Sequence, residues 1–270
     1  MKLRKIIIGL ALTGVLTAGL VPSASAADVL RVNGENLWTQ ASARLIDGST
    51  YVSLRTVAEV LDPGAQVSWE KGAAWVRGDG LSLSAVPGQN YLTVNGRALY
   101  IPGGVRLENG RTLVPIRVLA QAMGGEVDWS RETGVTLTPG SGRPGSAPYT
   151  EEELYWMSRI ISAESRGEPL LGKIAVGTVV LNRVASREFP NTIYDVIFDD
   201  KWGIQFEPVA NGTVYNEPTE ESVLAAKLVL EGARAAGDSL YFLAPDLTEN
   251  HWIMENRDHV VTIGCHWFYR

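Results

Sequence analysis

The chain has 270 residues, of which 45% are hydrophobic and 20% charged, and its formal net charge is −6 at pH 7. This composition is typical of a folded globular protein and excludes a long disordered or low-complexity chain. An acidic chain lacks the clustered Lys and Arg that neutralise phosphates, so we expect no nucleic acid among its partners. The length favours one large domain or two of ordinary size.

Residues 1–26 have the three parts of a secretory signal peptide. A basic start is followed by an apolar run over residues 6–21 and by the small residues Ala24, Ser25 and Ala26. The apolar run is shorter than the ~20 residues that a transmembrane helix needs. We therefore expect a secreted chain that loses this segment and has no membrane partner afterwards. Its one cysteine, Cys265, allows no internal disulfide and is expected to be a buried small hydrophobe.

An internal repeat organises the first half of the chain. The Val-Asn-Gly sequence of residues 32–34 recurs at 94–96, and residues 44–48 and 51–58 recur at the same spacing. Each unit then reaches a strand that carries a tryptophan, Trp69 or Trp129. The pattern predicts a Gly-turned hairpin, a short helix and a return strand in each unit.

These motifs resemble the stalk-type repeat domain named after the N-terminal domain of copper amine oxidases. The resemblance covers residues 28–139 and implies a β-rich, wall-associating attachment or spacing module. Copper is not expected, because this region contains no His and no Cys. Arg55 and Arg117 are interpreted as structural links within their repeats, with direct glycan binding as the alternative. Trp69 and Trp129 are expected to lie in the core rather than to bind sugars.

A segment rich in Gly, Pro and Ser, residues 140–149, follows the repeats and predicts a linker at a domain boundary. After it, Thr150 and Glu153 fit a capping box, and apolar residues at helical spacing predict a helix to about Arg166. Glu164 falls on the apolar face of this helix and in its last turn. Burial and the helix dipole should both raise the pKa of its carboxyl, as a general acid requires.

The motif around Glu164 and the blocks after it resemble the signature of the SleB/CwlJ cell-wall hydrolases in order and spacing. The blocks are residues 163–169, 172–177, 180–183, 189–192, 205–206, 211–212, 225–227, 240–242 and 262–269. The resemblance implies a mainly helical, lysozyme-like catalytic domain over residues 150–270, with a small antiparallel sheet near residues 240–269. The whole chain would then be an α+β protein of two domains.

The resemblance also implies the function. Glu164 would be the catalytic acid/base, the partners would be peptidoglycan glycan strands, and the location would be the cell wall or the spore cortex. No cofactor is expected, and a regulatory protein partner is left open. The residue after Gln205 and Phe206 is often a small hydroxyl residue in that family and is Glu207 here, while Cys265 stands where a polar residue is common. A catalytically inactive peptidoglycan-binding protein therefore stays an alternative.

Seven further residues are candidates for binding the substrate: Glu168, Asn182, Gln205, Phe206, Tyr241, His266 and Tyr269. Each has a structural alternative. Glu168 could pair with Arg166 or Arg183 or cap the next helix, and the two amides could bond loop backbone. The aromatic rings could fill a core instead of stacking on sugars, and His266 could be a hydrogen-bonded strand histidine.

Two other enzyme classes are weighed against a glycan-cleaving enzyme. A zinc amidase could use His251, His259 and His266 with Glu164, but their spacing matches no compact zinc motif, so no metal is expected. A cysteine peptidase could use Cys265, but adjacent residues of a strand point to opposite faces, so His266 could not be its base.

Glycoside hydrolysis normally needs two carboxylates, and the sequence places only Glu164 with an argument. The remaining acids, Asp195, Asp199, Asp200 and Glu207, fall in predicted loops. A lone acid/base suffices if the C6 hydroxyl of the muramic acid attacks its own anomeric carbon. This reasoning, together with the family resemblance, points to a lytic transglycosylase that acts on the MurNAc-GlcNAc bond.

Overall fold

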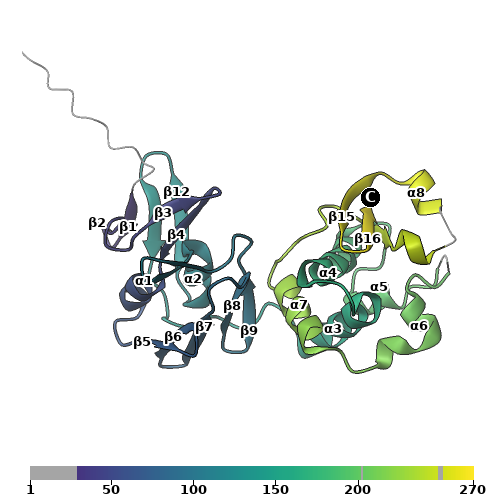
Figure 1. Cartoon of the computed structure of the whole chain (residues 1–270), viewed down its shortest axis with the longest axis horizontal. Coiled ribbons are helices and arrows are strands. Elements are labelled where there is room, and N and C mark those ends of the chain that lie inside the picture. The colour runs from purple at the N-terminus through teal and green to yellow at the C-terminus, as the bar shows by residue number, and fades with distance from the viewer. Residues whose placement is uncertain (1–28, 202, 249–251) are drawn as a thin grey trace, which may run out of the picture.

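The computed structural model describes residues 29–201, 203–248 and 252–270. The predicted signal peptide lies outside these residues. The fold is α+β with two parts, a β-rich N-terminal part and a mainly helical C-terminal part (Figure 1). No helix in the described ranges is long and apolar enough to cross a membrane.

The N-terminal part contains three sheets and two short helices. The first sheet has the order β10(Arg106–Glu108), β11(Arg111–Pro115), β4(Ser49–Ser53), β3(Arg44–Ile46). The second has the order β12(Glu126–Ser130), β13(Gly134–Thr138), β1(Leu30–Val32), β2(Glu35–Asn36). The third has the order β5(Gln66–Glu70), β6(Ala73–Gly78), β7(Leu81–Ala85), β8(Tyr91–Val94), β9(Arg97–Tyr100). The helices α1(Leu54–Leu61) and α2(Ile116–Ala122) pack their buried faces into the shared core.

The two repeats are related by a pseudo-two-fold axis. Strands β4 and β11 are equivalent by the repeat, and they pair antiparallel with Val52 directly opposite Val114, which is its own counterpart. Each outer sheet mixes strands of both repeats: β1 pairs with β13, while β8 is joined to β6 through β7. The predicted hairpin, short helix and return strand are present in both units.

The C-terminal part is built around three helices, α3(Glu151–Ser165), α4(Leu170–Ala185) and α7(Glu220–Leu230). Shorter elements complete it: α5(Ile193–Ile197), α6(Glu207–Asn211), η2(Thr213–Tyr215), β14(Tyr241–Leu243), η3(Pro245–Leu247), α8(Trp252–Asn256), β15(His259–Ile263) and β16(His266–Tyr269). The last strands form an antiparallel sheet of order β14-β16-β15, in the region where the sequence predicts one.

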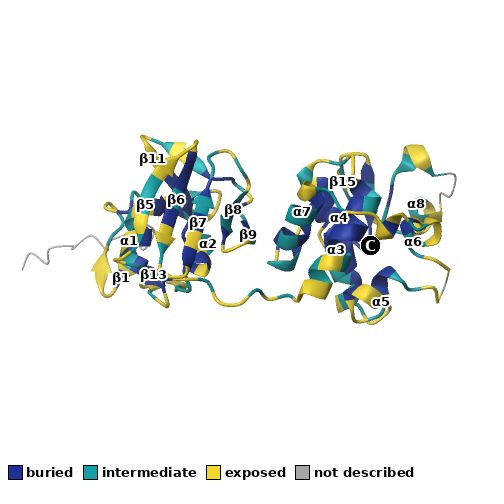
Figure 2. Cartoon of the chain, turned by 90° about the horizontal axis from the view of Figure 1, so that it is seen from below, coloured by how far each residue is buried: buried dark blue, intermediate teal, exposed yellow. Residues whose placement is uncertain are grey.

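Helix α3 begins and ends as the sequence predicts. Thr150 and Glu153 form a capping box, and the helix ends at Ser165, one residue before the expected end. It crosses α4 closely at Gly177, where an added Cβ would lie 2.9 Å from Ile161 and 3.0 Å from Val229 of α7. Figure 2 shows α3 and α4 carrying much of the buried surface of this part, because both line its core.

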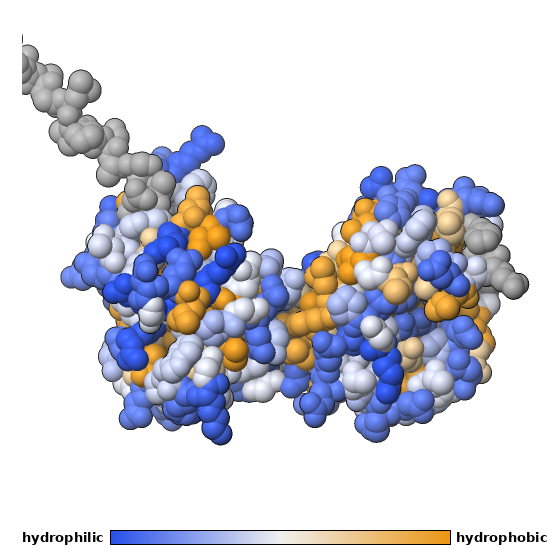
Figure 3. Space-filling model, in the orientation of Figure 1, coloured by the Kyte–Doolittle hydropathy of each residue, from blue (hydrophilic) through white to orange (hydrophobic). Residues whose placement is uncertain are grey.

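The two parts touch through β9 and α7. Arg97 pairs with Glu231 at 2.5 Å, with side chains only 11% and 1% exposed, and Lys227 donates to the Gly96 carbonyl at 2.6 Å. Ala98 belongs to the hydrophobic core of the C-terminal part. Figure 3 shows hydrophobic surface, in orange, where the two parts meet. The segment of residues 140–149 forms no helix or strand, and Arg97 also donates to its Gly145 carbonyl.

Candidate active site

Glu164 is half-buried in the last turn of α3, with the electrostatics expected of an acid catalyst. Burial, the largest cause, and the nearby Glu207 carboxylate raise the pKa of its carboxyl to about 7, although the Arg183 guanidinium acts to lower it. The predicted rise is therefore confirmed. Near neutral pH this group exists as both acid and carboxylate, so it can give a proton and take one back.

The carboxylate that acts on Glu164 belongs to Glu207, an exposed residue at the start of α6. The prediction of a loop there was wrong, because Pro208 begins a helical turn that Gly212 ends in a left-handed conformation. Asp195 is also helical, in α5, where its backbone N–H and its carboxylate both bond the Thr192 hydroxyl. Five-residue helices carry too few apolar positions to show a period in the sequence.

Arg183 of α4 is a buried cation close to Glu164, and the sequence suggested it only as a possible partner of Glu168. Its Nε donates to the Leu240 carbonyl at 2.8 Å, and its guanidinium carbon lies 4.8 Å from the Phe189 ring centroid and 5.1 Å from that of Phe206. Burial lowers its pKa to about 10, so it stays charged at neutral pH. Its Nη1 has no hydrogen-bond partner among the described residues. The one available signal was a cation within the apolar run of α4.

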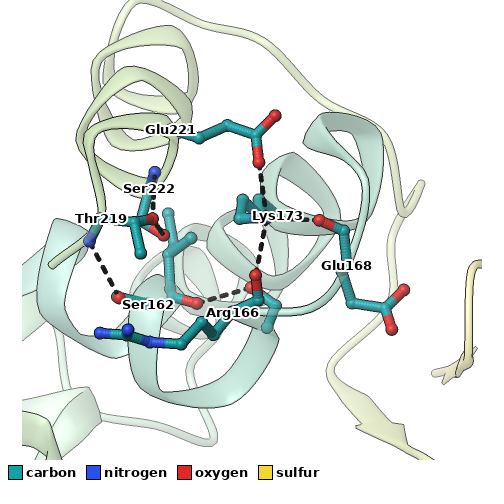
Figure 4. A network of polar contacts seen from close by, with 9 residues as sticks. Ser162, Arg166, Glu168, Lys173, Thr219, Glu221 and Ser222 are labelled. Carbon is teal, nitrogen blue, oxygen red and sulfur yellow. Dashed lines mark hydrogen bonds and ion pairs between the residues drawn. The ribbon is translucent and has the colours of Figure 1, made fainter.

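The chain that follows Glu164 is held by Lys173, whose side chain is 2% exposed (Figure 4). Its Nζ donates to the carbonyls of Arg166 and Glu168 and pairs with the Glu221 carboxylate of α7 at 2.8 Å. Thr219, the N-cap of α7, donates its N–H to the Ser162 hydroxyl of α3. The end of α3, and with it Glu164, is therefore tied to both α4 and α7.

Glu168 holds the turn between β15 and β16. Its Oε2 accepts the Cys265 N–H at 3.0 Å and lies 3.9 Å from His266 Nδ1, and its side chain is 9% exposed. A Cβ on Gly264 would come within 1.8 Å of this carboxylate, so only glycine fits there. The predicted pairing of Glu168 with Arg166 or Arg183 is wrong, because these arginines bond the Glu217 and Leu240 carbonyls instead.

Both parts of the chain match known protein families. Residues 167–269 match the Cell Wall Hydrolase family, and residues 30–138 match the Copper amine oxidase N-terminal domain family. The cell wall hydrolase CwlJ of Oceanobacillus iheyensis is 31% identical over 104 residues, which are 36% of this chain and 72% of that protein. The chain belongs to the cell wall hydrolase family.

Other relatives of this chain are spore cortex-lytic enzymes. The Bacillus cereus enzyme is 38% identical over 120 residues, 44% of this chain and 45% of the relative. The Bacillus subtilis enzyme is 32% identical over 120 residues, 44% of this chain and 38% of the relative. The match thus spans less than half of these proteins. The catalytic domain of the germination-specific lytic transglycosylase SleB from Bacillus anthracis is 36% identical, with 47% of this chain and 100% of that domain covered and a TM-score of 0.43.

Two of the predicted site residues, Phe206 and Tyr241, gather with Glu164 around Arg183. Phe206 is 2% exposed and packs beneath the guanidinium. Tyr241 is half-buried, with its ring centroid 5.7 Å from the Arg183 guanidinium carbon, and its hydroxyl accepts a hydrogen bond from Arg257 at 3.1 Å. Gln205 precedes Phe206, but its amide donates to the Gly203 carbonyl at 2.8 Å.

The other predicted residues are engaged within the fold. The Asn182 amide donates to the Gly237 and Ser239 carbonyls, both at 2.9 Å, which is the loop-backbone alternative. Tyr269 is 3% exposed and pairs across the sheet with Tyr241. His266 is 8% exposed, lies against Phe242 and has a pKa lowered by burial. These contacts favour structural roles for all three residues.

The residues of the two rival enzymes are also placed, except for His251, which lies outside the described residues. His259 bonds the Thr262 hydroxyl at 2.9 Å, and no group of three metal-binding side chains occurs within the described ranges. Cys265 is exposed in the turn before β16, so the prediction of a buried residue was wrong. The Glu168 charge raises the pKa of its thiol, which opposes thiolate chemistry.

Proposed function

We propose that this chain cleaves the glycan strands of peptidoglycan as a lytic transglycosylase, with Glu164 as its acid/base. The observation that carries the proposal is a carboxyl with a pKa of about 7 beside a buried arginine whose Nη1 has no bonding partner among the described residues. The proposal is supported by the spore cortex-lytic enzymes among the relatives. The proposed location is the cell wall or spore cortex of a secreted chain.

The reaction needs no second carboxylate and no water. Protonated Glu164 gives its proton to the oxygen that leaves from C1 of the MurNAc residue, and the bond between C1 and that oxygen breaks. The C6 hydroxyl oxygen of the same MurNAc then bonds to C1, and its proton goes to the Glu164 carboxylate, which restores the acid. The Arg183 guanidinium would stabilise the Glu164 carboxylate between the two proton transfers, because its charge favours the ionised form.

The products distinguish this reaction from hydrolysis. Purified wall and cortex peptidoglycan are digested in water enriched in oxygen-18, and the fragments are analysed by mass spectrometry. We expect 1,6-anhydro-muramic ends, each one water lighter than a reducing end and free of oxygen-18. Reducing muramic ends that carry oxygen-18 would overturn the mechanism and direct the search to Glu207, whereas free stem peptides would show an amidase.

Substitution of Glu164 tests the assigned acid. Glu164→Gln keeps the size of the side chain but cannot transfer a proton, so we expect cleavage to fall by at least the ~100-fold typical of losing general acid–base catalysis. The matched control is Glu152→Gln, which removes an exposed carboxylate from the same helix and should leave the rate unchanged. Near-normal cleavage by a folded Glu164→Gln protein would reject the assignment.

A further inference from the structure

The N-terminal part contains two grooves with the same construction. The first, about 550 Å³, lies between the turn before β4, the start of α2 and strand β12. The second, about 680 Å³, lies between the turn before β11, the start of α1 and strand β5. Each groove is lined by one tryptophan, one exposed leucine and two arginines. These residues are Trp129, Leu45, Arg117 and Arg131 in the first groove and Trp69, Leu107, Arg55 and Arg111 in the second.

The pseudo-two-fold axis relates the two grooves. Arg55 and Arg117 are equivalent by the repeat, as are Leu45 and Leu107, and each groove takes its tryptophan and its leucine from different repeats. Because the axis relates two antiparallel strands of one sheet, it runs perpendicular to that sheet. The grooves therefore lie at opposite ends of the β4–β11 pair and on the same face.

The apolar residues of the grooves are exposed instead of packed. Trp69 is 51% and Trp129 58% exposed, while Leu45 is 64% and Leu107 51% exposed. The expectation that both tryptophans lie in the core was therefore wrong. A single exposed apolar residue is ordinary, but the same pair at two equivalent sites favours a ligand. An indole face beside an aliphatic side chain suits the apolar face of a sugar ring.

The charged residues that line the grooves indicate an anionic ligand. Each groove is lined by two arginines and by no Asp or Glu, although the chain carries a net charge of −6. Arg117 is fixed by its bond to the Val127 carbonyl at 2.7 Å, and Arg55 is paired with Glu59 at 3.6 Å, so the predicted structural links are present. The side chains of Arg131 and Arg111 form no hydrogen bond or ion pair with any described residue. They can therefore bind a carboxylate of the ligand.

We propose that the two grooves are paired binding sites for peptidoglycan glycan strands. The indoles of Trp69 and Trp129 stack on sugar rings, and the arginines bind carboxylates of the muramic lactyl groups or stem peptides. Two equivalent sites on one face bind an insoluble polymer more tightly than either site alone, because the second contact is intramolecular. The identity of the ligand rests on the function proposed above, whereas the grooves do not depend on Glu164.

The test is co-sedimentation of the full-length chain, carrying Glu164→Gln to prevent cleavage, with insoluble peptidoglycan. We expect Trp69→Ala or Trp129→Ala to weaken binding several-fold, and the double variant to weaken it by more than about 10-fold through lost avidity. Trp75→Ala is the matched control, because Trp75 lies on the neighbouring strand β6 outside both grooves. Unchanged binding by the folded double variant would overturn the proposal.

Two further measurements separate the grooves from the active site. With Glu164 restored, Trp69→Ala/Trp129→Ala should cleave short soluble glycan fragments at the normal rate, so a loss of cleavage would contradict a role confined to binding. Chitin fragments, which lack carboxylates, should bind the grooves more weakly than peptidoglycan fragments. Equal binding of both would reject the role of the arginines. Indole N–H resonances of Trp69 and Trp129 that do not shift with peptidoglycan fragments would reject both sites even if a variant failed to fold.

Discussion

Two charged neighbours, Glu207 and Arg183, change the pKa of Glu164 in opposite directions, and one of them is a surface residue that can be substituted. The Glu207 carboxylate raises the pKa of Glu164, and Glu207 is exposed. If cleavage needs protonated Glu164, activity should fall as pH rises through about 7. Glu207→Gln should lower the pKa of Glu164 and move this fall to lower pH in a profile of kcat/KM. A profile that does not move would show that Glu207 does not act on Glu164.

The same raised pKa affects stability. The folded protein holds the Glu164 proton up to about pH 7, whereas an unfolded carboxyl loses it near its usual value of 4.5. The contribution of Glu164 to the free energy of unfolding is therefore fully present below about pH 4.5 and is lost as pH rises through about 7. A shift of this size lowers the free energy of unfolding by up to ~3 kcal/mol. Glu164→Gln should unfold at higher urea concentration than the unmodified chain at pH 8, with little difference at pH 4. A gain of equal size at both pH values would contradict a raised pKa.

The sequence predicts the burial and the raised pKa of Glu164 but not the residues around it, for a physical reason. Glu164 belongs to a 15-residue helix whose period and capping box identify the buried face. Arg183 and Glu207 come from two other helices, and only the packing of α4 and α6 near the end of α3 brings them close. Exposure was misjudged for Trp69, Trp129 and Cys265, because residue type alone does not say which side chains a fold leaves uncovered.

Among the elements, the connection from α3 to α4 depends on one lysine. Lys173→Met would keep the apolar bulk but leave the partly buried carbonyls of Arg166 and Glu168 without their donor. We expect a loss of about 2 to 4 kcal/mol in urea unfolding and a lower kcat, because the end of α3 that carries Glu164 is released. Glu221→Gln removes only the half-exposed partner and should cost under about 1 kcal/mol. Equal losses of stability for both variants would contradict the role of Lys173 in holding the connection from α3 to α4.

At the scale of the whole molecule, the Arg97–Glu231 pair decides how the two parts are held. Arg97→Ala would leave the Glu231 carboxylate buried without its partner, at a cost of about 3 to 5 kcal/mol if the contact stayed closed. Separation of the two parts rehydrates Glu231 and avoids this cost. We therefore expect an increased radius of gyration by small-angle X-ray scattering and faster proteolysis within residues 140–149. Arg77→Ala, which breaks the exposed pair with Glu70, is the control and should change neither.

The sequence predicted two parts joined by a Gly/Pro/Ser segment, but not the contact between them. Such composition predicts flexibility, and the boundaries proposed for the domains and the linker stay predictions. The contact needs Arg97 from one part and Glu231 from the other, and these residues are far apart in the chain. No local sequence pattern predicts that two charged residues far apart in the chain are buried against each other.

The pairing of Val52 with Val114 also bears on the origin of the N-terminal part. A strand that lies opposite its own counterpart is what two identical chains form when they meet across a two-fold axis. The two outer sheets follow the same two-fold symmetry, because each combines the first hairpin of one repeat with the return strand of the other. The arrangement matches that of a symmetric homodimer of one repeat, and duplication and fusion of a gene for a single repeat would produce it. Neither half would then be a folding unit, and every later mutation would act on one groove at a time, free to make the two sites differ.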